Sequence, residues 1–260
     1  MKKICFAATM VACSAFFLQT VYAHEFIVKP ERMSTQVGHK MGVKVLSAHV
    51  FMKSEEVEPI DQVEVYKVAS ERQDLQLQVN EQEKILEGEV NDDGENSYLL
   101  CGHRKPMIWT KTTEGWKQES KKNLSGVISS GIYEKFSKAY VDGIQNEEKY
   151  KISVGHRLEI IPVENPSKLT PGEELQVKVI FDGKPIATEL YATFDGFSTT
   201  PSTYAYFSAT NAKGEGSVKI TSNGTWMVRV QHEVEEPNEN YDKHVLRAVF
   251  LFGVGSVNAG

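Results

Sequence analysis

The clearest evidence for the fold class is in "ELQVKVIFDGKPIATELYATF", residues 174–194. Apolar and polar side chains alternate over residues 174–181 and 188–194, and the dipeptide Asp182-Gly183 lies between the two runs. Alternation is the pattern of a half-buried β-strand, because successive side chains point to opposite faces of a sheet. Asp-Gly is typical of a tight turn. This stretch therefore predicts two strands with a turn between them.

The same pattern continues through the second half of the chain. Turns with Gly, Pro or Asn chemistry are expected at residues 170–172, 182–183, 213–214 and 223–224. The strands expected around them are residues 157–163, 174–181, 188–194, 205–209, 215–220, 225–233 and 244–252. Short strands with a turn about every ten residues favour a Greek-key β-sandwich of the immunoglobulin or transthyretin-like type, over residues 151–260.

The first half of the exported chain, residues 24–150, also alternates. Strands are expected at residues 26–28 and 42–50, and within "QVEVYKVAS" (62–70), "LQLQVNEQEKILEGEV" (75–90) and "SYLLCGHR" (97–104). The polar residues 109–126 are interpreted as a loop. In "SSGIYEKFSKAYVDG" (129–143), Tyr133, Phe136 and Tyr140 stand at i, i+3 and i+7, which predicts a short amphipathic helix. The predicted fold class is all-β: two β-sandwich domains that meet near residues 145–156, with one short helix in the first.

Residues 1–23 have the pattern of a secretory signal peptide. Lys2 and Lys3 precede an apolar run over residues 4–18, and a small residue, Ala23, ends the segment. Such a peptide is removed on export, so we expect a periplasmic protein that begins at His24. The alternative is a lipoprotein processing site at "MVAC", residues 10–13. The apolar residues after Cys13 argue against it.

Charge and motif content exclude several classes of function. Without Lys2 and Lys3 the chain carries 27 basic residues (29 less these two) against 35 acidic ones, a net charge of −8. Nucleic acid is therefore not an expected partner, because it requires a basic surface. Residues 24–260 contain no stretch long and apolar enough to span a bilayer, and no transmembrane segment is expected. Motifs such as Gly-x-Ser-x-Gly and His-Glu-x-x-His are missing, so we do not expect an enzyme.

Two further groups have plain interpretations. The adjacent acids Glu55 and Glu56 are interpreted as a solvated face, as such neighbours on loops usually are. Cys101 is the one cysteine after the predicted signal, so an internal disulfide is excluded. Its thiol is expected to be either buried and inert or a metal ligand.

All seven histidines follow the predicted signal peptide. Neutral imidazole suits nickel, copper and zinc ions. His24 has the strongest case, because cleavage after Ala23 gives it a free α-amine beside its own ring. The amine and the ring Nδ1 close a chelate around one ion, and an amine pKa of roughly 8 makes the proton release modest. The sequence therefore predicts a metal ligand that only cleavage creates.

Other histidines lie at the positions expected of site residues. His49 in "LSAHVFM" is a polar ring within an apolar strand. His232 ends one predicted strand and His244 begins the next, where the loops of a sandwich gather to form sites. His103 follows Cys101 by two residues, on the same side of its strand. The candidate metal ligands are His24, His49, His232, His103 and His244.

Several stretches taken together resemble a known family. They are "AHEF", "SAHVFMKSEEVEP", "GHRKPMIWTKTTEGW", "YEKFSKAY", "GHRLEIIPVENPSKLTPGEELQVKVIFDGKPI" and "GTWMVRVQHE". The set resembles an exported domain-of-unknown-function family that includes periplasmic accessory proteins of nickel and cobalt uptake (NikK-like). The resemblance covers essentially all of residues 24–260. It implies a soluble β-rich periplasmic protein that binds a divalent ion, with His24, His49 and His232 matching family histidines and His103 next.

These observations lead to one expected function and two alternatives. We expect a nickel or cobalt binding protein in which His24, His49 and His232 surround one Ni²⁺ or Co²⁺, with Cu²⁺ or Zn²⁺ as the competing ions. It would supply the ion to a membrane uptake permease. The first alternative is a metal-independent module that interacts with another envelope protein. The second is a copper protein in which the N-terminal amine and two rings hold a redox copper.

Overall fold

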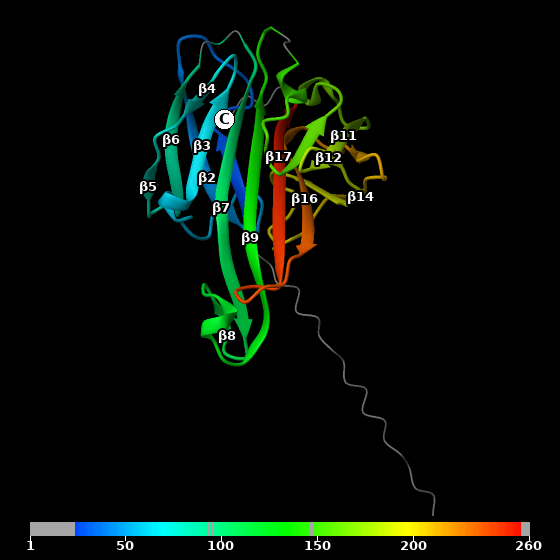
Figure 1. Ribbon diagram of the computed structural model, residues 1–260. Helices are drawn as coiled ribbons and strands as arrows, with labels where there is room; N and C mark the ends of the chain where they lie inside the picture. The colour runs from blue at the N-terminus through cyan, green and yellow to red at the C-terminus, as the bar shows by residue number, and fades with distance from the viewer. Residues whose placement is uncertain (1–23, 93, 95, 146–147, 256–260) are drawn as a thin grey trace, which may run out of the picture.

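The structure is a computed structural model that describes residues 24–92, 94, 96–145 and 148–255 (Figure 1). Its strands are β1 (Glu25–Pro30), β2 (Lys40–Ala48), β3 (Val63–Val68), β4 (Arg72–Asp74), β5 (Gln78–Asn80), β6 (Ile85–Asn91), β7 (Tyr98–Thr112), β8 (Gly115–Lys117), β9 (Val127–Val141), β10 (Leu158–Pro162), β11 (Glu174–Phe181), β12 (Lys184–Pro185), β13 (Glu189–Phe194), β14 (Tyr206–Ala209), β15 (Glu215–Lys219), β16 (Gly224–Glu235) and β17 (Lys243–Val254). Four short 3-10 turns accompany them: η1 (Ile60–Gln62), η2 (Lys121–Asn123), η3 (Lys149–Lys151) and η4 (Pro166–Lys168). The all-β prediction is confirmed.

Helices play little part in the described residues. They contain no α-helix, and none of their helical turns has the length and apolar character to cross a bilayer. The predicted signal peptide, residues 1–23, lies outside the described residues.

The strands form three sheets, and both halves of the chain share the largest. That sheet has the order β14-β13-β16-β17-β9-β7-β3-β4, with β8 beside β7. The smaller sheets are β1-β2-β6-β5 and the group of β10, β11, β12 and β15. In the central strand β7, Leu99 and Cys101 belong to the core beneath β10 and β11, whereas Leu100 belongs to the core beneath β1 and β2. The two smaller sheets therefore cover opposite faces of the large one.

Strand β17 joins the two halves of the chain. It pairs antiparallel with β16 and parallel with β9, from Lys243 opposite Gly131 to Leu251 opposite Ala139. Phe250 and Leu251 lie in different cores, so β17 is covered on both faces. A strand buried in this way has a nearly continuous apolar sequence, as residues 245–254 have. The predicted boundary at residues 145–156 lies between β9 and β10, and the large sheet continues across it.

The strands predicted for the second half all occur, and their ends differ from the prediction by at most two residues. The Asp182-Gly183 turn joins β11 to the short strand β12. Both turn residues have positive φ, 45° at Asp182 and 75° at Gly183. Positive φ at both positions defines a type I′ turn, which matches the twist of the two strands it connects. Local turn chemistry therefore determines this hairpin.

The helix predicted at residues 129–143 is wrong. These residues belong to β9, which pairs with β7 on one side and with β17 on the other. The strand is covered on both faces, and its aromatic residues are distributed over both. Phe136 and Tyr140 point to one core, and Tyr133, an odd number of residues away, points to the opposite face. Buried polar residues interrupt the alternation. Ser137, for example, accepts a hydrogen bond from the Val28 amide at 2.9 Å.

The loop predicted at residues 109–126 is wrong in its first part. Strand β7 continues to Thr112 and turns into β8, and the two form an arm with β9 that extends beyond the body of the protein (Figure 1). The polar sequence is compatible with a strand because its hydroxyls are paired. Thr110 Oγ1 lies 2.7 Å from Ser130 Oγ of β9.

Candidate metal centre

His24 and His49 meet at the end of the first β-ladder. Strand β1 pairs with β2 so that Glu25 lies opposite Ala48. The next position outward on each strand is a histidine, and residues opposite each other in an antiparallel pair have side chains within contact distance. The two ring centroids are 3.8 Å apart, with 39° between the ring planes. Register alone therefore brings together two of the histidines selected from the sequence.

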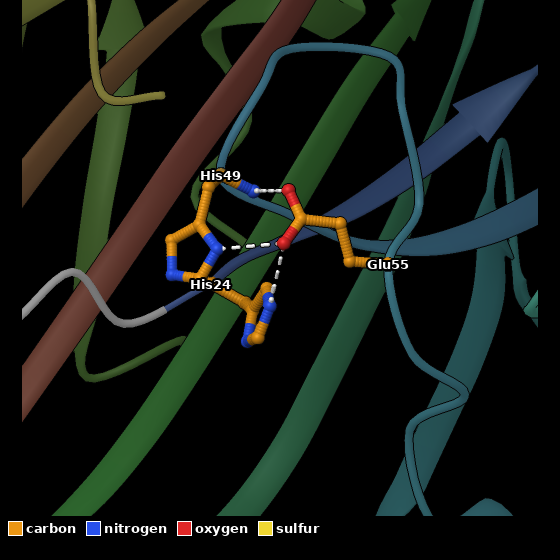
Figure 2. A group of neighbouring side chains, drawn as sticks. All are labelled: His24, His49 and Glu55. Carbon is orange, nitrogen blue, oxygen red and sulfur yellow. Dashed lines mark hydrogen bonds and ion pairs between the residues drawn. The ribbon is translucent and has the colours of Figure 1, made fainter. Parts of the chain in front are cut away.

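Glu55 joins the two rings because the chain after β2 turns back. The Lys53 amide donates to the Val50 carbonyl at 3.0 Å, which closes a tight turn. In Figure 2 the carboxylate of Glu55 bridges the edges of the two rings: its Oε2 is 2.9 Å from His49 Nδ1 and 3.3 Å from His24 Nε2. Its other oxygen accepts the His49 backbone N–H at 3.2 Å.

Glu56 contacts the other nitrogen of His24. Its Oε1 lies 2.9 Å from His24 Nδ1 and also accepts the Ser47 hydroxyl at 3.2 Å. The hydrogen bond from His24 lowers the pKa of Glu56 to about 2. Burial lowers the pKa of His24, but the Glu56 and Glu55 carboxylates outweigh it, and the net shift is upward. Both ring nitrogens of His24 therefore face ionised oxygens.

The donor set suits a divalent transition-metal ion. His24, His49 and Glu55 each offer one ligand atom, and these atoms lie within 4.8 Å of one another. Imidazole nitrogen combined with carboxylate oxygen is a ligand set of zinc, nickel and related ions. Burial raises the pKa of Glu55, and its contacts with His49 reverse the effect and lower it. The carboxylate is therefore ionised at neutral pH, as a metal ligand must be.

The third ligand predicted for this ion, His232, belongs to a different part of the fold. It lies on β16 opposite Leu246 of β17, and its ring packs against Phe181 of β11 at 4.5 Å between centroids. Burial lowers the pKa of His232. Among the described residues, the group that could hold an ion contains His24, His49 and Glu55. The fold thus provides a carboxylate where the sequence analysis expects a third imidazole.

His103 and His244 converge on Glu134 in a second cluster. The carboxylate of Glu134 lies 2.8 Å from His103 Nε2 and 3.2 Å from His244 Nε2. Burial raises the pKa of Glu134, but the two histidines outweigh it and bring the pKa to about 2. Arg157 Nη1 lies 3.2 Å from His244 Nδ1 and 3.8 Å from Glu134. A fixed guanidinium beside the carboxylate already supplies positive charge, so this cluster suits an ion-pair network better than a metal site.

Cys101 is fully buried in the core, 0% exposed. Burial raises the pKa of its thiol to about 12. Since the thiolate is the form that binds metals and reacts, the structure favours the inert interpretation of this residue.

Glu55 and Glu56 are the site residues that the sequence analysis assigns to a solvated face. Their signal in the sequence is the short distance from His49, six and seven residues, across a segment that can close a tight turn. Nothing in "SEE" itself distinguishes a ligand from a surface acid. The contacts to His24 depend on β1, which is distant in the chain.

The fold defines the class of protein: an all-β chain of stacked, mainly antiparallel sheets. This chain belongs to the family described as Domain of unknown function (DUF4198), which matches residues 21–234. No curated protein matches it.

Three solved structures are similar over most of the chain. The D0-D1 domain of Intimin is 11% identical with a TM-score of 0.22, and the match covers 89% of this chain and 98% of that one. A mutant of Salmonella alpha-2-macroglobulin is 12% identical with a TM-score of 0.25, covering 88% and 15%. The Yersinia pseudotuberculosis adhesin InvE is 9% identical with a TM-score of 0.21, covering 86% and 58%. TM-scores at this level imply nothing about function.

Proposed function

We propose that this protein binds a divalent transition-metal ion, nickel or cobalt, in the periplasm and supplies it to a membrane uptake permease. The observation that carries the proposal is the convergence of His24, His49 and Glu55 from three separate segments. Each is partly buried, which restricts the side chain, yet each remains within reach of solvent. Partial exposure allows an ion to enter and leave, as delivery to another protein requires.

The N-terminal amine is the fourth donor in this proposal. Cleavage after Ala23 would free the amine of His24, next to a ring whose Nδ1 already faces the Glu56 carboxylate at 2.9 Å. Because Glu55 faces Nε2 of the same ring, the ring would have to turn for the amine and Nδ1 to chelate an ion that His49 and Glu55 also bind. The result is a set of nitrogen and oxygen donors. Cu²⁺ binds most such sets more tightly than Ni²⁺ does, so selectivity would depend on geometry and on which ion is available.

Titration calorimetry with Ni²⁺ on the chain that begins at His24 tests the ligand assignment. We expect His49→Ala to weaken binding at least about 100-fold, more than the loss of an outer-shell partner costs. Glu55→Gln should weaken it about tenfold or more. The matched control is His39→Ala, at an exposed position outside the cluster, which should leave affinity unchanged. Unaltered affinity in His49→Ala would refute the proposal.

A second pair of chains tests the amine. One begins at His24, and the other carries a single Gly before it, which displaces the amine and retains every side chain. We expect the added Gly to weaken Ni²⁺ binding at least tenfold, and equal affinities would exclude the amine as a ligand. Negligible uptake of nickel, cobalt, copper and zinc by both chains would favour the metal-independent interaction module instead.

A further inference from the structure

A pocket of about 460 Å³ lies beside His24, between the β7–β8 arm and the segment that leads from β2 to β3. Its volume is in the range of pockets that bind small organic molecules. Apolar and aromatic side chains form most of its wall: Val57, Pro59, Met107, Trp109, Trp116 and Tyr133. The charged residues of the wall are His24, Glu56, Glu58, Arg104 and Lys135.

Four of the five charged side chains in this wall form two ion pairs, and the fifth is a cation. Lys135 Nζ lies 3.2 Å from Glu58 Oε1, and His24 Nδ1 lies 2.9 Å from Glu56 Oε1. Arg104 forms no ion pair with a carboxylate among residues 24–92, 94, 96–145 and 148–255. The pocket therefore contains an arginine without a counterion in the described part of the chain.

Arg104 is also deeply buried, at 2% exposure. Its Nη1 donates to the Lys105 carbonyl at 3.2 Å, and its Nε has no hydrogen-bond partner in the described residues. Burial lowers the pKa of Arg104, although the charges of Glu58 and Glu134 oppose this shift. A buried cation without a counterion is costly, because water no longer solvates it. An anion that entered the pocket would remove that cost.

The chemistry of the wall indicates the class of ligand. A guanidinium presents parallel N–H donors that match the two oxygens of a carboxylate. The aromatic wall formed by Trp109, Trp116 and Tyr133 provides an apolar surface for the rest of the molecule. We propose that this pocket binds a small organic carboxylate with an aromatic or aliphatic body, whose carboxylate pairs with Arg104. Because His24 lines the same pocket, the ligand would lie next to the candidate metal ligands.

Three probes with the same phenylmethyl group test the proposal on the metal-free chain that begins at His24. Phenylacetate carries the carboxylate, phenylacetamide is its neutral counterpart, and 2-phenylethylamine is a cation. Calorimetry should show binding of phenylacetate, with the amide at least about tenfold weaker, since hydrogen bonds to charged groups are the stronger ones. The amine should not bind. Equal binding of the three probes, or none by phenylacetate, would overturn the proposal.

Variants locate the bound probe. Arg104→Met should abolish the preference for phenylacetate over the amide, and Arg104→Lys should keep part of it because the charge remains. Since Arg104 is buried and its loss can unfold the chain, Trp116→Ala provides a second test at a partly exposed position of β8. Trp116→Ala should weaken phenylacetate binding several-fold, whereas Tyr206→Ala, on β14, should not. Unchanged binding in folded Arg104→Met, or in Trp116→Ala, would contradict the assignment.

The proposals for the pocket and for the metal site can be refuted independently of each other. His49 lies outside the lining of this pocket, so His49→Ala should lose Ni²⁺ and retain phenylacetate. If the unsubstituted chain binds Ni²⁺ but not phenylacetate, the pocket assignment is refuted. If it binds phenylacetate but not Ni²⁺, the proposed function is refuted.

Discussion

His24 contacts both glutamates of the candidate metal centre. Its two ring nitrogens face two different carboxylates, Glu56 at 2.9 Å and Glu55 at 3.3 Å. These acids raise the pKa of His24 above its ordinary value of 6.5. Protons and metal ions compete for imidazole nitrogen, so the carboxylates that attract a metal ion also favour the proton at acidic pH. Metal affinity should accordingly decline as pH falls through the pKa of His24.

Replacement of Glu56 tests this electrostatic coupling in the metal-free protein. Glu56→Gln should lower the pKa of His24, because burial lowers this pKa and one of the two carboxylates that raise it is then missing. NMR titration of the His24 ring measures the shift. The control Glu81→Gln, at an exposed position away from the cluster, should leave the ring unchanged, and an unshifted pKa in Glu56→Gln would contradict the coupling.

The same pair should make stability depend on pH. A raised histidine pKa stabilises the fold below 6.5, and this contribution is lost as pH rises through the raised value. A lowered glutamate pKa stabilises the fold above 4.5, and this contribution is lost as pH falls toward about 2. Glu56→Gln should therefore destabilise the fold most between pH 4.5 and pH 6.5, where both groups are charged. The expected loss is only about 0.2–1 kcal/mol, because solvent screens the exposed Glu56. Urea denaturation at pH 5.5 and pH 9 measures the difference, and an equal effect at both pH values would contradict it.

Cys101 allows a simple prediction at the same scale. Its thiol is buried and its pKa is raised to about 12, so the thiolate is almost absent at neutral pH. In the chain that begins at His24, a thiol reagent such as Ellman's reagent should react with Cys101 only after denaturation. Rapid labelling of the folded protein at pH 8 would contradict the burial, and urea-denatured protein supplies the control for full reactivity.

Strand β9 shows how an element takes its form from its neighbours. The aromatic spacing in residues 129–143 fits a helix, yet β7 and β17 provide hydrogen-bonding partners along both edges. A strand with sheets on both faces cannot alternate between apolar and polar residues, so its sequence loses the usual strand signature. It also contains buried polar groups. One of them is Lys138, which forms an ion pair with Glu159 of β10 at 3.0 Å.

The Lys138–Glu159 pair connects the large sheet to the β10–β11 sheet. Both side chains are nearly inaccessible, at 3% and 0% exposure. Removal of one partner leaves the other charge buried and unpaired, so Lys138→Met alone should lower the free energy of unfolding by about 3–5 kcal/mol. The double variant Lys138→Met, Glu159→Gln should be less destabilised than the sum of the single variants. Chemical denaturation of all four proteins measures the coupling, and strict additivity would show that the pair does not interact.

At the scale of the whole molecule, the two halves of the chain share one sheet. The parallel ladder between β17 and β9 joins them, and the core beneath β10 and β11 includes Tyr66 and Leu99 from the first half. Parallel pairing across so many intervening residues is non-local, and residues 151–255 alone would leave β17 with an open edge and an uncovered face.

This arrangement predicts that the second half does not fold alone. A fragment of residues 151–260 should lack cooperative thermal unfolding and should aggregate, whereas residues 24–260 should unfold in one transition. Circular dichroism and calorimetry on both chains make the comparison. A fragment with its own cooperative transition would show that the predicted boundary near residues 145–156 separates two independent domains.

Features of this protein that depend on neighbouring residues can be predicted from the amino-acid order. Alternation and turn chemistry locate the strands of the second half, and the Asp182-Gly183 turn follows from two adjacent residues. For the same reason His24 and His49 could be selected as candidates from the sequence, whereas Glu55 and Glu56 could not. What those carboxylates contact depends on a turn after β2 and on a ladder to β1.

Contacts between residues distant in the chain become visible only in the folded protein. Pairing between distant segments determines the strand form of β9, the sheet shared by the two halves and the separation of His232 from His24. It also buries Arg104 with an Nε that has no hydrogen-bond partner among the described residues. The physical reason is that periodicity reports which face of a strand is covered, whereas the identity of the covering element depends on non-local hydrogen bonds and packing. A strand covered on both faces, such as β9, loses even that local signal.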